Sequence, residues 1–200
     1  MKGRIWAIAA LVAAIVIGAT GYLVLRPSNR PAATGLGGPF VLENGQGKSF
    51  SSSQLAGKPY IIFFGYTHCP DVCPATLTEL TSDIKALGSD ADKMNYLFVT
   101  IDPARDTPAI MQAYVGSFDP RIIGLTGTAA QIATIAREWH VFYRKEPGGG
   151  KDYAMEHSAT AYLMDASGGF AGFFNFQDRP EKQLAKIHAV LDGHSALDIN

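Results

Sequence analysis

Residues 59–87 read PYIIFFGYTHCPDVCPATLTELTSDIKAL, and this stretch decides the fold. Its first part, Pro59 to Gly65, is an apolar run rich in β-branched and aromatic residues, which is typical of a buried strand. Further on, apolar side chains recur at close to helical spacing up to Gly88, at Val72, Leu77, Leu80, Ile84 and Leu87. The stretch therefore predicts a core strand followed by a core helix, with two cysteines at the junction.

The chain beyond this stretch continues to alternate between strand and helix patterns. Extended segments are expected at 96–101, 122–125, 141–143, 159–164 and 169–176, the last two as a hairpin. Helices are expected to open near Pro108, at Thr128 and at Pro180, and Gln131 completes a capping-box pattern with Thr128. This order predicts an α/β domain in which helices cover both faces of a mixed sheet. Ligands of such sheets bind at the carboxyl ends of the strands, where the cysteines lie.

The N-terminal part of the chain has the pattern of a membrane anchor. Residues 5–25, IWAIAALVAAIVIGATGYLVL, carry no charge, and a helix of this length covers about 30 Å, the thickness of a bilayer core. Lys2 and Arg4 favour a cytoplasmic N-terminus at residues 1–4 and a periplasmic domain on a bacterial inner membrane, although Arg26 and Arg30 weaken this orientation. The alternative is a cleaved signal peptide, whose apolar region spans about 7–15 residues and precedes a small-residue cleavage site. The stretch at 5–25 is longer and ends in YLVLR, without such a site.

Composition narrows the possible functions of the rest of the chain. Residues 26–38, RPSNRPAATGLGG, predict a flexible tether, which leaves 39–200 as the folded domain. The formal net charge is -1 and there is no basic run, so nothing indicates nucleic-acid binding. The two cysteines, Cys69 and Cys73, would close too small a loop to stabilise the fold by a disulfide. The pair is therefore expected to have a chemical role rather than to serve as a structural crosslink.

The spacing of Cys69 and Cys73 suits a shared metal or redox site. If a helix begins directly after Cys69, residues four apart lie on one face, and the helix N-terminus lowers the pKa of the thiols. Thiolates are nucleophiles and soft ligands that select Cu(I) or zinc. A structural zinc site needs four ligands, which two cysteines do not supply. A pair of buried, inert cysteines is the other alternative, and the polar, proline-containing surroundings argue against it.

A third ligand would come from the histidines. His188 and His194 lie in the last helix and tail, and His140 follows a helix, so surface or capping roles are expected for all three. His68 adjoins Cys69 and is a candidate for tuning that thiolate rather than for binding metal. His157 stands directly before the strand predicted at 159–164. Composition alone leaves its role open.

Four segments of the chain together form a recognisable pattern: FGYTHCPDVCP at 64–74, IDPARDTP at 101–108, IGLTG at 123–127 and EHSATAYLMDASGGF at 156–170. They resemble the signatures of the Sco/SenC family of copper-binding proteins. Their order and spacing agree with that family over residues 38–192, and only Glu156, where the family often has aspartate, departs from it. The resemblance implies a thioredoxin-like fold with one copper ion, Cu(I) or Cu(II), bound by Cys69, Cys73 and His157.

The same resemblance implies a role in assembling the binuclear copper centre of cytochrome c oxidase subunit II. The protein would receive copper from an upstream donor and deliver it to that subunit or to another copper enzyme. It would alternatively act as a thiol-disulfide oxidoreductase through Cys69 and Cys73, with an external thiol reductant as partner. Asp102, in the IDPARDTP segment, would support the site or contact a partner, or else be a turn aspartate before Pro103.

A third function, peroxidase, disagrees with the residues around Cys69. Peroxiredoxins have proline seven residues and threonine three residues before the nucleophilic cysteine, where this chain has Ile62 and Tyr66. Thiol-disulfide enzymes of the thioredoxin type have two residues between their cysteines, whereas three separate Cys69 from Cys73. The spacing and the candidate histidine ligand favour copper binding over redox catalysis.

Overall fold

The computed structural model describes residues 35–148, 150, 152–175 and 178–199. The predicted anchor at 5–25 and most of the predicted tether at 26–38 lie outside these residues. Among the helices that are described, none combines the length and apolar character needed to cross a bilayer. The anchor remains a prediction.

The described residues contain short strands and four α-helices. The strands are β1 (Val41–Asn44), β2 (Ser49–Ser51), β3 (Tyr60–Gly65), β4 (Asn95–Thr100), β5 (Ile122–Thr126), β6 (Tyr143–Lys145), β7 (Met155–His157), β8 (Thr160–Met164) and β9 (Phe170–Asn175). The α-helices are α2 (Val72–Leu87), α3 (Pro108–Val115), α4 (Ala129–Glu138) and α5 (Pro180–Leu191), with 3-10 turns η1 (Ser52–Leu55) and η2 (Gly88–Lys93). The strands and helices expected from the sequence are all present, with ends that shift by one or two residues.

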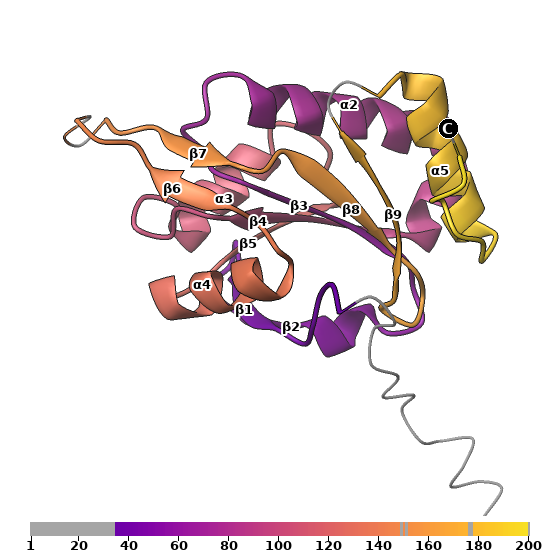
Figure 1. Cartoon of the computed structure of the whole chain (residues 1–200), viewed down its shortest axis with the longest axis horizontal. Helices are drawn as coiled ribbons and strands as arrows, with labels where there is room; N and C mark the ends of the chain where they lie inside the picture. The colour runs from indigo at the N-terminus through magenta and orange to yellow at the C-terminus, as the bar shows by residue number, and fades with distance from the viewer. Residues whose placement is uncertain (1–34, 149, 151, 176–177, 200) are drawn as a thin grey trace, which may run out of the picture. The chain divides into compact units, whose positions relative to one another are not determined.

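Seven strands of the described chain form one mixed sheet in the order β2-β1-β5-β4-β3-β8-β9. Strands β3, β4 and β5 are parallel, whereas the remaining neighbours pair antiparallel. Helices α2 and α5 lie over one face of this sheet and α4 lies over the other (Figure 1). Every residue of β3 is buried, as a strand covered on both faces requires. The predicted mixed sheet flanked by helices is confirmed.

Helix α4 is capped at its start, and the residue that follows it packs on the sheet. The Thr128 hydroxyl accepts the N–H of Gln131, and the Gln131 side chain reaches back to the Thr128 N–H, so the predicted capping box is confirmed. At the other end, the fully buried Trp139 packs against Tyr60 and Phe64 of β3, with ring centroids 6.4 and 5.8 Å away. This aromatic contact stabilises β3, the strand that leads into the cysteine segment.

Three short strands were not predicted from the sequence. Strands β1 and β2 extend the sheet beyond β5, and β7 pairs with β6 in a separate two-stranded sheet. Residue 37 also packs on the domain, because the Gly37 N–H donates to the carbonyl of Glu138 at 2.9 Å. The hairpin of β6 and β7 matters most for function, because His157 is its last residue.

Candidate metal centre

Cys69 lies just before helix α2, and Cys73 lies in the first turn of that helix. The helix begins at Val72, and its N-cap Asp71 has a φ of -139°, outside the helical range. The helix therefore begins where the apolar pattern predicts, and Cys69 lies before it rather than within it. Cys69 lies in the preceding turn, where its N–H donates to the carbonyl of Tyr66 at 3.2 Å.

The sulfur of Cys69 nevertheless faces Cys73, because it takes the place of a capping side chain. Its Sγ accepts the backbone N–H of Cys73 at an N–S distance of 3.3 Å. That N–H is one of the donors that the first turn of a helix leaves without an intrahelical partner. The turn thus brings both sulfurs to the positive end of α2, which favours a thiolate.

The two thiols differ strongly in acidity. A hydrogen bond from the Cys73 thiol, then one from His157 and the backbone N–H groups of Cys73 and Asp71, lower the pKa of Cys69 to about 4. The pKa of Cys73 is raised, because its proton is held by the Cys69 sulfur and because its side chain is buried. The arrangement therefore produces a half-buried thiolate at Cys69 beside a buried thiol at Cys73.

His157 directs one ring nitrogen at this pair. Its Nε2 lies 3.5 Å from Sγ of Cys73, and its Nδ1 lies 2.8 Å from the carbonyl oxygen of Ser158. Because a carbonyl only accepts hydrogen bonds, Nδ1 carries a proton, and Nε2 is the ring nitrogen that faces the sulfurs. The ring also packs edge-on against Tyr66, with centroids 5.8 Å apart.

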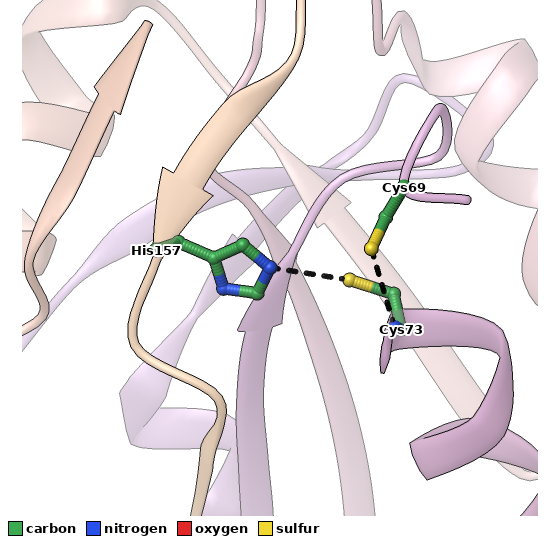
Figure 2. Close-up of side chains that lie close together, drawn as sticks. All are labelled: Cys69, Cys73 and His157. Carbon is green, nitrogen blue, oxygen red and sulfur yellow. Dashed lines mark hydrogen bonds between the residues drawn. The ribbon is translucent and has the colours of Figure 1, made fainter. Parts of the chain in front are cut away.

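These three side chains form a potential ligand set. The two sulfurs and a ring nitrogen all lie within 4.8 Å of one another, and Figure 2 shows them converging from β7, the turn and α2. Two thiolates and one imidazole suit copper, whose monovalent ion prefers sulfur and whose divalent ion accepts nitrogen. The chemistry of the donor set thus fits a copper ion.

The other histidines lie outside this group. His68 is exposed, and its Nδ1 lies 3.1 Å from Oγ1 of Thr67 and 4.0 Å from Oδ1 of Asp106. His140 follows α4 with a φ of 50°, and it is exposed together with His188 and His194. The surface positions expected for His140, His188 and His194 are confirmed.

Comparison with known proteins places this chain in a family. The family model described as SCO1/SenC matches residues 28–192. The chain belongs to the SCO1/SenC family. It is 41% identical over 162 residues to mitochondrial SCO2 of Saccharomyces cerevisiae, covering 80% of this chain and 54% of the yeast protein. It is 32% identical over 195 residues to SenC of Rhodobacter capsulatus, covering 93% of this chain and 88% of that protein. The chain thus spans about half the length of the yeast SCO2 protein.

Solved structures of SCO1/SenC proteins have the same fold. Bradyrhizobium japonicum ScoI with copper bound superposes with a TM-score of 0.73 at 46% identity, over 78% of this chain and 99% of that one. Yeast Sco1 with copper bound superposes with a TM-score of 0.74 at 36% identity, over 80% of this chain and 90% of that one. The thioredoxin-like α/β fold implied by the sequence resemblance is confirmed.

In this SCO1/SenC protein, Asp102 lies in a turn after β4 rather than beside the three candidate ligands. Its carbonyl accepts the N–H groups of Arg105 and Asp106, as in the turn anticipated from the sequence. Its buried carboxylate accepts Nε–H of Arg105 at 2.5 Å and the hydroxyl of Tyr153 at 2.7 Å. Any effect of Asp102 on the site would therefore pass through Arg105 and Tyr153.

Sequence reasoning missed a second buried aspartate that fixes the cysteine turn. The carboxylate of Asp106 accepts the backbone N–H and the hydroxyl of Thr67, at 3.1 and 2.5 Å, and the hydroxyl of Thr100 at 2.6 Å. Thr67 is two residues before Cys69, so Asp106 holds the chain where it leaves β3. The only sequence signal was its place in the IDPARDTP segment, which did not reveal the contact with Thr67.

Proposed function

We propose that this protein is a copper metallochaperone that binds one copper ion through Cys69, Cys73 and His157. The observation that carries the proposal is the set of two sulfurs and one imidazole nitrogen within 4.8 Å of one another. The copper-bound structures of related ScoI and Sco1 proteins support copper over zinc. Copper is the cargo in this proposal.

Each ligand has a distinct part in holding and releasing the cargo. Cys69 offers a half-exposed thiolate, so it would meet the incoming ion first. Cys73 is buried and must lose its proton to bind, which makes uptake release a proton. The imidazole of His157 supplies a neutral nitrogen whose orientation is fixed by its hydrogen bond to Ser158.

A second function, thiol-disulfide exchange, is favoured by the unequal acidity of the same pair. The Cys69 thiolate would attack a disulfide of the target, which forms a mixed disulfide and expels one target thiolate. Cys73, after losing its proton, would attack the Cys69 sulfur, expel the second target thiolate and leave a Cys69–Cys73 disulfide. Nε2 of His157 lies 3.5 Å from Sγ of Cys73 and would accept that proton. An external thiol reductant would restore the pair.

The setting of the site follows from the same proposal. Residues 5–25 would anchor the chain in a bacterial inner membrane, with residues 39–200 on the periplasmic side. The partners would be an upstream copper donor and cytochrome c oxidase subunit II or another copper enzyme. The family relationship and the uncharged N-terminal stretch support this setting.

The deciding experiment measures copper stoichiometry and reductase turnover on the same reduced sample. We expect one Cu(I) per chain and slow turnover of a disulfide substrate. Cys69→Ser and Cys73→Ser should each abolish tight binding, whereas His68→Ala should leave it unchanged as the matched control. A protein that binds no copper but turns over disulfides would make thiol exchange the function instead.

A further inference from the structure

The position of His157 depends on contacts outside the main sheet. Strands β6 and β7 pair only with each other in the described chain, through Tyr143 opposite His157, Arg144 opposite Glu156 and Lys145 opposite Met155. An isolated two-stranded hairpin is marginally stable in water. The hairpin therefore needs side-chain contacts to keep His157 against the cysteines.

A largely buried guanidinium connects the hairpin to the loop that follows β4. Cζ of Arg105 lies 3.6 Å from the ring centroid of Tyr153, a residue that leads into β7, and Nζ of Lys145 lies 3.6 Å from the same centroid. The Tyr153 hydroxyl donates to Asp102, which also holds Arg105. Only 15% of the Arg105 side chain is exposed, so solvent screens these contacts weakly. We call Asp102, Arg105 and Tyr153 the hairpin clamp.

The clamp is connected to the ligands through Tyr66. The Arg105 guanidinium also lies over the Tyr66 ring, at 5.8 Å from its centroid. The Tyr66 hydroxyl accepts the N–H of Met155 at 3.3 Å, two residues before His157, and its ring packs edge-on against the imidazole. Tyr66 is also three residues before Cys69. Arg105 therefore contacts one residue from the cysteine segment and one from the hairpin.

We propose that Arg105 and Tyr153 are positioning residues that hold His157 at the cysteine pair, an inference that rests on the proposed copper site. The cysteines are held by hydrogen bonds outside the clamp. The Thr67 N–H donates to the Asp106 carboxylate, and the Cys73 N–H donates to Sγ of Cys69. Loss of the clamp therefore frees the hairpin and leaves the two sulfurs in place. The clamp sets the contribution of the imidazole, and hence the preference between Cu(II) and Cu(I).

The first test needs no metal. Amide hydrogen exchange is measured on the reduced, metal-free full chain for wild type, Arg105→Met, Tyr153→Leu and Tyr153→Phe. We expect the Met155 amide and its neighbours in β7 to exchange at least about 10-fold faster in the Met and Leu variants, while β3 and α2 keep their protection. Tyr153→Phe keeps the ring over Arg105 and should give a smaller increase. Unchanged exchange of β7 in Arg105→Met and Tyr153→Leu would overturn the proposal.

The matched control is Arg144→Gln, which removes one positive charge from the hairpin without touching the clamp. Arg144 pairs with Glu156 across the two strands, and both side chains are exposed. Its effect on β7 exchange should be small beside that of Arg105→Met. If Arg105→Met does not fold, the difference between Tyr153→Leu and Tyr153→Phe decides the question.

The second test is the spectrum and affinity of bound copper. We expect Arg105→Met to weaken Cu(II) binding about 10-fold, as loss of an outer-shell partner does, with a smaller effect on Cu(I). Its Cu(II) paramagnetic resonance should lose imidazole nitrogen coupling, as in His157→Ala. An unchanged nitrogen signal with mobile β7 would mean that the clamp does not position the ligand. If the wild-type protein binds no copper, the proposed function fails. The hydrogen-exchange experiment would still test whether Arg105 and Tyr153 hold strand β7 in place.

Discussion

A methyl group on Gly65 would lie 2.6 Å from Sγ of Cys73. Gly65 is the last residue of β3, and the missing side chain leaves the space that the Cys73 sulfur fills. The same methyl group would lie 2.8 Å from Cε2 of Phe98 on β4. The absence of a side chain at the end of β3 thus allows a helix to bring its cysteine directly onto the sheet.

Gly65→Ala should destabilise the protein and displace the Cys73 sulfur from His157. Overpacking of this kind costs about 1–3 kcal/mol of unfolding free energy. Denaturant unfolding and Cu(I) competition titrations measure the two effects. Part of the stability cost should vanish in a Cys73→Ala background, where the sulfur is absent and only the Phe98 contact remains. Equal costs in both backgrounds would show that the sulfur is not the obstacle.

Cys69 should react with iodoacetamide well below neutral pH. Because the Cys73 thiol and His157 lower the pKa of Cys69 to about 4, its alkylation rate should reach a plateau near pH 6. Cys73, whose pKa is raised, should react slowly throughout. Mass spectrometry of the labelled peptides from reduced, metal-free protein measures both rates.

The causes of this acidity can be separated by mutation. Cys73→Ala removes the largest stabilisation of the thiolate and should raise the pKa of Cys69 more than His157→Ala does. In denaturant both cysteines should behave as free thiols with a pKa of about 8.5. A Cys69 rate in the folded protein that rises only above pH 8 would contradict the proposed hydrogen bonds.

Local patterns predicted the framework of the fold. The apolar run before Gly65 gave β3, the helical spacing gave α2, and Thr128 with Gln131 gave the start of α4. Each of these signals depends on side chains close together in sequence, so a short segment of the sequence is enough to predict the element. The same signals placed Cys69 and Cys73 at the carboxyl end of a core strand.

The parts of the site that local patterns did not predict depend on contacts between distant residues. His157 lies in a three-residue strand that pairs with Tyr143, and no periodic pattern is recognisable over three residues. Its nitrogen meets a sulfur 84 residues earlier in the chain. The contact between Asp106 and Thr67 spans 39 residues and likewise leaves no local signal. Only the family resemblance indicated His157.

The three candidate ligands should differ in their effects on the two oxidation states of copper. Cys69→Ser and Cys73→Ser should each lower Cu(I) affinity by at least about 100-fold, because each removes a soft ligand. His157→Ala should weaken Cu(II) more than Cu(I), since two thiolates already satisfy the softer ion. Competition titrations for each ion measure these changes. An unchanged Cu(II) spectrum in His157→Ala would exclude His157 and make His68 the next candidate.

Asp83 should make the protein less stable as the pH rises towards neutrality. Its carboxyl lies in α2 with a buried, unpaired Oδ2 among the described residues, and burial with the nearby Glu79 charge raises its pKa to about 7. An unfolded aspartate titrates near pH 4, so the unfolding free energy should fall between about pH 4 and 7 and stay low above that.

Asp83→Asn removes this titration. The variant should match wild type near pH 4 and exceed its unfolding free energy by on the order of 2 kcal/mol at pH 8. Denaturant unfolding of the metal-free protein at both pH values gives the comparison. Asp198→Asn, a change at an exposed carboxylate, serves as the control. A stability difference that does not change with pH would contradict the raised pKa.

Oxidation of the cysteine pair should abolish copper binding at this site. The two sulfurs lie within 4.8 Å of each other, so a small movement of the turn at Cys69 would allow a disulfide. The Cys69 thiolate and the Cys73 thiol would together lose one proton, and an oxidant would take two electrons. A disulfide sulfur has no thiolate charge to offer the metal, so copper binding and cysteine oxidation exclude each other.

Anaerobic Cu(I) titration of fully oxidised and fully reduced protein, with free thiols counted before and after, tests this exclusion. We expect one site in the reduced form and none in the oxidised form, and reduction should restore it. Equally tight binding by both forms would mean that the cysteines are not the ligands.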